Sequence, residues 1–221
     1  MKIFFLNLPI SKKISFLLIA VVSACFLVSG AVTFLSIFAS IEKMLGEKLQ
    51  LIINTGVLMI HAEDHQKIEQ AIINQEQNVA KTAPFKKIQK ILQEIKRNNN
   101  LSEDVYTVIA PDWADGHLIF VAMSNKKTYV GNSIKTREEV SVALKTGKSQ
   151  YSKIYTDSEG VWVSAFAPIL NETGKPVAVI KVDYHTEREI AEARQRLLLS
   201  IGIPTNQNEP RFYLISKSRP A

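Results

Sequence analysis

A long uncharged stretch near the N-terminus constrains this chain more than any other feature. Residues 14–41 are twenty-eight in number, and none of them carries a charged side chain. A helix rises about 1.5 Å per residue, so this stretch is longer than the roughly 30 Å hydrocarbon core of a bilayer. The sequence therefore predicts a transmembrane helix over residues 14–41.

The charges around this stretch predict which way it crosses the membrane. Lys2, Lys12 and Lys13 precede it without any acidic residue, whereas the charged residues just after it cancel. An excess of positive charge marks the cytoplasmic side of a membrane helix. We therefore expect residues 1–13 in the cytoplasm and the residues after the helix on the other side of the membrane.

A cleaved signal peptide is the alternative interpretation of the same stretch. Signal peptides have an apolar region of about 7 to 15 residues that ends at a small-x-small cleavage site. Ser29, Gly30 and Ala31 form such a triplet, but the apolar run continues for ten residues beyond Ala31. A cleavage site does not need this extension, so we favour an uncleaved anchor.

The composition excludes several classes of protein. The net charge is +6, and the three N-terminal lysines supply half of it, so the remainder is too mildly basic to indicate a nucleic-acid partner. Cys25 is the single cysteine and lies in the predicted membrane helix, which leaves no internal disulfide or thiolate metal site. The sequence has no P-loop and no dinucleotide fingerprint, and we expect no cofactor.

Two amphipathic helices are predicted after the membrane segment. Residues 40–80 have helical spacing with two neighbouring apolar stripes, which consist of Leu45, Leu49 and Ile52 and of Ile53, Val57 and Ile60. A face of this width predicts that the helix packs on its own domain and also on a second copy of the chain, which gives a homodimer. Pro84 opens the second helix, and the asparagines at 98–100 end it.

From residue 101 the apolar period changes from that of a helix to that of a strand. The expected strands are residues 104–110, 117–123, 126–131, 150–155, 161–169 and 176–184, with a short helix at 137–145 and an exit helix from Thr186. The turns between the strands are short, which predicts an antiparallel sheet with helices on one face. The fold class is therefore α+β.

The order of these elements, and the segment GVWVSAFAPILNETGKPVAVIKVD at residues 160–183, resemble the single Cache domains of bacterial receptors. The segment MIHAEDH at residues 59–65 is similar to the Asp-His segment of cyclase-linked members. The resemblance covers about residues 40–195. It implies a PAS-like extracytoplasmic sensor that binds a small molecule, anchored in a bacterial inner membrane, with a periplasmic domain over residues 42–196.

The resemblance also leads to an expectation about the C-terminal tail. Receptors of this kind usually return through the membrane to an output domain, but the apolar run that starts at Leu197 meets Pro204 after seven residues. Seven helical residues reach only about 10 Å. We expect residues 197–221 to be a truncated tail without an output domain, and a non-signalling remnant is one alternative function.

Seven residues are candidates for the ligand site. The resemblance implies that Asp183 faces a ligand amine, and the alternative is that it caps backbone at the start of the exit helix. Trp162, Ser164 and Phe166 share one strand face, which forms either a pocket wall or ordinary core. Arg137 suits a ligand carboxylate, and Tyr129 and Tyr155 offer further polar tips. The expected ligand carries an amine or a carboxylate.

A metal-dependent hydrolase is the alternative function from another class. His61 and His65 stand four residues apart on a predicted helix, with Asp64 between them, and zinc enzymes use two histidines at this spacing. The zinc motif has Glu where Asp64 stands, and a third ligand has no obvious source. We therefore expect no metal and no enzymatic activity.

Overall fold

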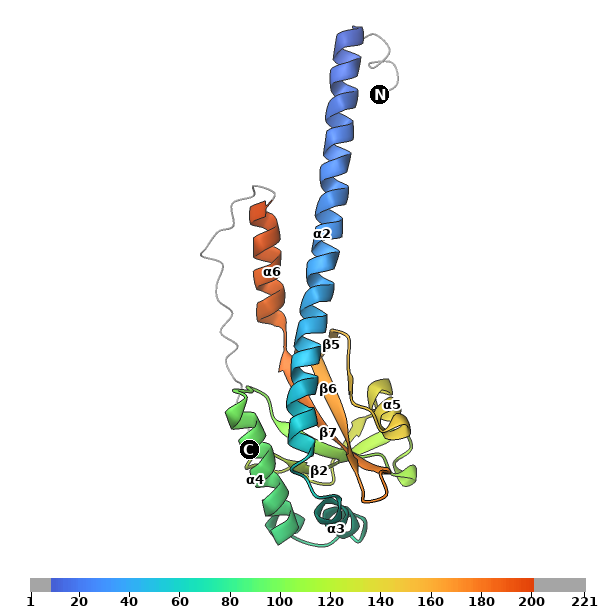
Figure 1. The fold of residues 1–221 in the computed structure, drawn as a ribbon, viewed down its shortest axis with the longest axis vertical. Helices are drawn as coiled ribbons and strands as arrows, with labels where there is room; N and C mark the ends of the chain where they lie inside the picture. Colours follow the sequence, from blue (N-terminus) through green and yellow to red (C-terminus); the bar gives the residue numbers. More distant parts are fainter. Residues whose placement is uncertain (1–8, 201–221) are drawn as a thin grey trace. The chain divides into compact units, whose positions relative to one another are not determined.

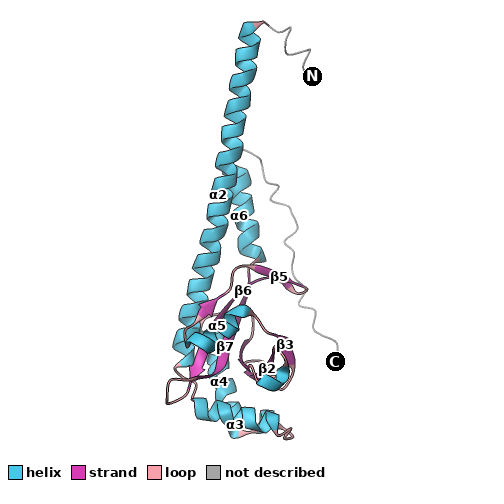
Figure 2. Cartoon of the chain, turned by 90° about the vertical axis from the view of Figure 1, so that its right-hand side faces the viewer, coloured by secondary structure: helices cyan, strands magenta, loops and turns pink. Residues whose placement is uncertain are grey.

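The computed structural model describes residues 9–200. These residues belong to two compact units, one of which runs from Ser40 to Arg188 and contains the sheet, while the other joins the residues before Ser40 to those after Arg188. The unit from Ser40 to Arg188 carries the candidate site. Figures 1 and 2 show its helices and strands.

The first helix, α2, runs from Ile10 to Val57 and includes the whole predicted membrane segment. In the described part of the chain it is the helix that is long and apolar enough to cross a bilayer. The helix continues beyond that segment, and its last turns pack into the core through Leu49 and Ile53. The predicted apolar helix over residues 14–41 is therefore confirmed, and it is continuous with the first part of the helix that was expected from residue 40.

The single helix expected over residues 40–80 is wrong, because the chain breaks after Val57. Helix α3 covers Ala62–Ile73, and a short 3-10 turn follows at Val79–Lys81. Near the break, a Cβ on Gly56 would lie 2.6 Å from Ile95 Cδ1, so the missing side chain lets the next long helix approach. Ile60, in the break between the two helices, is buried in the core.

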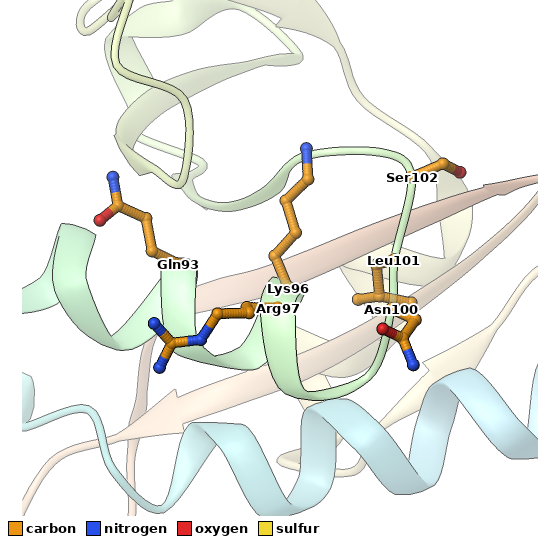
Figure 3. A pocket seen from close by; sticks show the side chains of 6 residues that line it. All are labelled: Gln93, Lys96, Arg97, Asn100, Leu101 and Ser102. Carbon is orange, nitrogen blue, oxygen red and sulfur yellow. The ribbon is translucent and has the colours of Figure 1, made fainter.

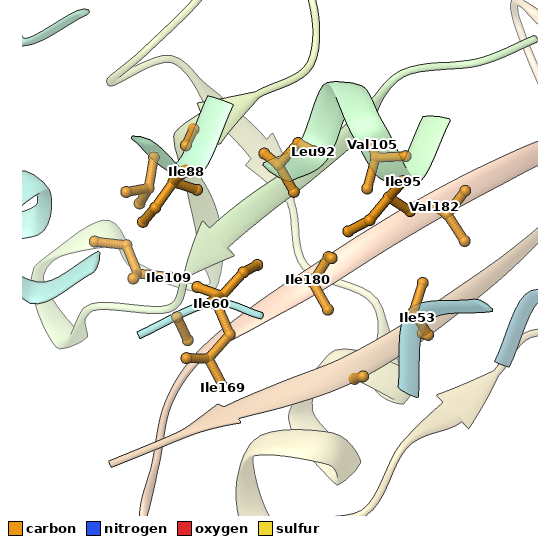
Figure 4. Close-up of a cluster of buried hydrophobic side chains, with 14 of the residues drawn as sticks. Ile53, Ile60, Ile88, Leu92, Ile95, Val105, Ile109, Ile169, Ile180 and Val182 are labelled. Atoms are coloured by element: carbon orange, nitrogen blue, oxygen red, sulfur yellow. The ribbon is translucent and has the colours of Figure 1, made fainter. Parts of the chain in front are cut away.

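Helix α4 covers Ala83–Asn98 and confirms the second predicted helix. Its proline lies in the first turn, where a missing N–H costs nothing. Four side chains on one face are buried, and they are Phe85, Ile88, Leu92 and Ile95. Figure 4 shows part of this face against Ile180 and Val182 of the sheet.

Seven strands of the described chain form one antiparallel sheet in the order β3-β2-β1-β7-β6-β4, with β5 also paired to β6. The strands are β1 Val105–Ile109, β2 His117–Met123, β3 Ser133–Lys135, β4 Gln150–Tyr151, β5 Tyr155–Asp157, β6 Gly160–Leu170 and β7 Pro176–His185. The antiparallel α+β prediction is confirmed. The long pair β6 and β7 forms the hairpin that the sequence predicts.

Two strand predictions need correction. Residues 126–131 form a loop, and the third strand is β3, because Gly131 at a φ of 81° turns the chain before the pairing with β2 begins. The loop still carries side chains towards the core, since Tyr129 and Val130 pack against it. The strand expected at 150–155 is split into β4 and β5, which both pair with β6.

Helices cover both faces of the sheet, and not one face as predicted. Helices α2, α3 and α4 pack on one face, against side chains such as Val163 and Ile180. Helix α5 (Glu138–Thr146) packs on the other face, against a second cluster that includes Tyr106, Phe166 and Val179. In Figure 1, α5 lies on the far side of β6 and β7 from α2. The last helix, α6, covers Glu187–Ser200.

Candidate ligand-binding site

The alternation of side chains along β6 and β7 brings the predicted site residues to one face. Ser164 and Phe166 point to the α5 side of β6, and Asp183 is the cross-strand partner of Ser164 on β7. Asp183 does not end its strand, because β7 continues to His185. The α5 face therefore carries the predicted wall and the predicted carboxylate side by side.

Asp183 is the centre of a hydrogen-bond network. Tyr106 donates its hydroxyl to Asp183 Oδ2 at 2.6 Å, and Ser164 donates its hydroxyl to Oδ1 at 2.5 Å. Tyr155 places its hydroxyl 2.8 Å from Ser164 Oγ. These contacts hold the carboxylate within the sheet face. They differ from the alternative in which Asp183 caps backbone at the exit helix.

Lys181 completes this network, and sequence analysis did not single it out. Its Nζ lies 2.9 Å from Asp183 Oδ1, and only 7% of its side chain is exposed. The ammonium also lies 5.2 Å from the ring centroid of Tyr106 and 5.8 Å from that of Phe166. A lysine two residues before an aspartate in a strand points to the same face, and this spacing could have identified it.

Arg137 and Tyr155 form the part of the site that comes from outside β6 and β7. The guanidinium carbon of Arg137, just before α5, lies 3.7 Å from the centroid of the Tyr155 ring. Its Nη2 donates to Glu139 at 3.2 Å. Its Nε is buried and has no hydrogen-bond partner in the described part of the chain. This donor is available to an acceptor from a ligand.

The other two predicted residues lie further from the carboxylate. Tyr129 packs edge-on against Phe120, which in turn packs against Tyr106. Trp162 is on the same side of β6 as Ser164, but its indole N–H donates to Asp157 and its ring packs edge-on against His185. Tyr129 thus extends the aromatic wall, whereas Trp162 fixes the β5–β6 turn.

Burial and the carboxylate change the acidity of the two tyrosines. Burial, followed by the negative charge of Asp183, raises the pKa of Tyr106 well above its usual value. The same two causes raise the pKa of Tyr155 to about 12. Both hydroxyls therefore stay protonated at neutral pH and act as hydrogen-bond donors.

The three residues of the alternative metal site do not converge. His61 is exposed at the start of α3, while His65 is fully buried and its Nε2 lies 3.0 Å from Thr107 Oγ1. Asp64 accepts a 2.6 Å bond from Lys87, and this bond is the main cause that lowers its pKa. Among the described residues, no three His, Cys, Asp or Glu side chains are grouped to hold a metal ion.

An open pocket of about 590 Å³ lies elsewhere, at the end of α4. Its lining residues are Gln93, Lys96, Arg97, Asn100, Leu101 and Ser102, as Figure 3 shows. None of the seven predicted site residues is among them. Lys96 and Gln93 already bond Asp104 and the Ser124 carbonyl, so much of the polar lining is engaged in holding the fold.

Comparison with known proteins supports the fold. No protein-family model matches the sequence, and no curated protein matches it significantly. The sensor domain of the V. cholerae histidine kinase DctB matches with a TM-score of 0.51 at 14% identity. The match covers 78% of this chain and 61% of that one, so this chain spans less than two thirds of the DctB structure.

Two further solved structures have lower TM-scores. The E. coli DcuS sensor domain gives 0.43 at 15% identity, over 70% of this chain and 97% of that one. The ligand-binding domain of the C. jejuni chemoreceptor Tlp3 gives 0.37 at 18% identity, over 73% and 63%. The DctB match by itself confirms the Cache-like fold that the sequence predicts.

Proposed function

We propose that this protein is a membrane-anchored, extracytoplasmic sensor module of a bacterial receptor, and that it binds a small molecule on the α5 face of its sheet. The observation that carries the proposal is the convergence of Asp183, Lys181, Tyr155 and Arg137 on that face of a sensor-type fold. Ligand sites combine an apolar wall with a few fixed polar groups, and this face has both.

The contacts of the segment between α5 and β5 support a route from this site to the membrane helix. The backbone N–H of Ile154 donates to Glu42 of α2, and Gln50 of α2 donates to the Ser149 carbonyl. The same segment leads into Tyr155, whose hydroxyl reaches Ser164 in the site. A ligand that binds one arrangement of this segment better than another would shift α2 without any chemical reaction.

The anchor and its orientation belong to the same proposal. The predicted domains are the cytoplasmic residues 1–13, the membrane helix 14–41 and the periplasmic sensor 42–196, in a bacterial inner membrane. The predicted tail 197–221 lies largely outside the described residues. A reporter fused after Gln50 should report an extracytoplasmic location, and a cytoplasmic signal would overturn this topology.

We also propose that the chain is a homodimer, with a contact that differs from the one first expected. Leu45, Leu49 and Ile53 of the two predicted stripes are buried in the chain's own core. A third row faces outward, and it consists of Met44 and Leu51 on α2 and of Leu58 just after the end of the helix, which are 58%, 69% and 82% exposed. The seven-residue spacing of Met44 and Leu51 along the helix is that of a coiled-coil seam, which favours a second copy as the partner.

A thermal-shift screen tests the binding function. The full chain in detergent is melted with a panel of small carboxylates, amines and amino acids, and a ligand should raise the melting temperature. Arg137→Gln should lose most of that shift, because it removes a donor from the site. Lys175→Gln, an exposed residue in the β6–β7 turn, is the matched control. Equal shifts in Arg137→Gln and wild type would place the site elsewhere.

A further inference from the structure

Lys181 places an amine of the protein itself in the middle of the candidate site. It stands on β7, a central strand, and is 6% exposed as a whole residue. Lysine is almost never this buried unless its charge has a partner. Asp183 is that partner, at 2.9 Å from the ammonium.

The surroundings of this ammonium are those of an amine-binding site. Its cross-strand neighbours are Phe166 on β6 and Tyr106 on β1, and both rings lie within 6 Å of Nζ. Aromatic faces next to a cation are a common means of recognising ammonium ligands. The Lys181 ammonium therefore occupies the position in which a ligand ammonium would contact the Phe166 and Tyr106 rings and the Asp183 carboxylate.

The carboxylate has little capacity left for a second amine. Asp183 Oδ1 accepts from Ser164 and pairs with Lys181, while Oδ2 accepts from Tyr106. A ligand ammonium at Asp183 would either meet Lys181 at close range or expel it. The first outcome places like charges together in a poorly solvated site, and the second strips a buried charge of its partner.

We propose that Lys181 is a specificity-determining residue that makes the site reject amines and select small carboxylates without an ammonium group. This inference rests on the proposed function of the α5 face. An anionic ligand would approach the cations of Lys181 and Arg137 and accept from the buried Arg137 Nε. Amino acids would be excluded, although the same site without Lys181 would suit their amine.

The first test removes the Lys181 amine by mutation and then supplies a free alkylammonium ion from solution. Lys181→Ala in the full chain should melt at a lower temperature, and n-propylammonium, which matches the lost Cγ, Cδ, Cε and Nζ atoms, should raise the midpoint by about 3 °C or more. The wild type and the exposed control Lys175→Ala should not respond. If Lys181→Ala folds only when the amine is present, the rescue is the same result. Failure of the amine to rescue folding or stability overturns the proposal.

The second test compares each amino acid with a carboxylate of the same carbon skeleton that lacks the amine. Wild-type chain is melted with succinate and aspartate, with pyruvate and alanine, and with 4-methyl-2-oxopentanoate and leucine. Only the members without an amine should stabilise the wild type, and an equal shift from the amino acid of a pair would overturn the role of Lys181. If no compound of either kind stabilises the wild type, the proposed function fails for this panel, while the n-propylammonium result still decides the role of Lys181.

Discussion

At the scale of single residues, the domain contains a poorly exposed ion pair and a fully buried histidine. Lys181 and Asp183 form a pair on the α5 face, and His65 is fully buried on the other side of the sheet. His65 supports an irregularity, because its partner Thr107 lies at the β1–β2 register shift and accepts the backbone N–H of Ala122. Each group predicts a measurable change.

We expect His65 to make the protein sensitive to acid. Burial lowers the pKa of His65 from 6.5 to about 4, so the unfolded chain binds a proton at this residue before the folded chain does. The associated stability is present in full above pH 6.5 and is lost as the pH falls towards 4, by about 3 kcal/mol. His65→Gln should flatten this part of a urea-unfolding profile against pH. The exposed His61→Gln should not, and an unchanged slope in His65→Gln would contradict the assignment.

Asp183→Asn should destabilise the fold strongly. Removal of one member of a buried ion pair leaves the other charge without compensation, which costs about 3 to 5 kcal/mol, and Lys181 is the charge that remains. Chemical denaturation of the full chain measures the loss. Asp115→Asn, at an exposed turn position where φ is 44°, should cost little because asparagine tolerates that conformation. A melting curve for Asp183→Asn that matches the wild type would mean that the ion pair contributes no stability.

At the scale of elements, Gly46 allows α2 to pack closely against the segment that contains β4. A Cβ on Gly46 would lie 2.2 Å from Tyr151 Cδ2 and 2.7 Å from two more ring atoms. Tyr151 belongs to β4, in the segment whose backbone also bonds Glu42 and Gln50. The contact between α2 and this segment therefore depends on a position without a side chain.

Gly46→Ala should destabilise the domain by about 1 to 3 kcal/mol, because the methyl group overpacks against the Tyr151 ring. Gly30→Ala is the matched control in the same helix, since a Cβ there meets nothing within 4 Å, and alanine favours helix. The double variant Gly46→Ala/Tyr151→Ala should recover part of the loss in a double-mutant cycle. Equal melting temperatures for Gly46→Ala and Gly30→Ala would contradict this prediction, because they would show that the segment around Tyr151 shifts to accept the methyl group without a loss of stability.

At the scale of the whole molecule, the row formed by Met44, Leu51 and Leu58 predicts self-association. Leu51→Glu should convert a dimer of the full chain in detergent to a monomer in sedimentation equilibrium, because it places a charge in the apolar seam. Leu170→Glu makes the same change at another exposed leucine, 44% exposed at the end of β6, and should leave the dimer intact. A wild-type chain that sediments as a monomer at high concentration would remove the dimer from the proposal.

The sequence alone determined the elements whose signal is local. The uncharged run of residues 14–41 predicted an apolar helix, the 3.6-residue period predicted α4, and the alternation along residues 160–183 predicted the β6–β7 hairpin. Those signals depend on neighbours a few residues apart, so no tertiary information was needed. The shared face of Ser164 and Phe166 followed from the same alternation.

Only the tertiary structure decided what depends on contacts between distant residues. The break after Val57 follows from the packing of Ile60 and Gly56 against the core, and helical periodicity continues across it. The partners of Asp183 come from three strands, and the burial of Lys181 depends on Phe166 and Tyr106 from the neighbouring strands. A buried charge is identified by what surrounds it, and that environment is assembled only when the sheet forms.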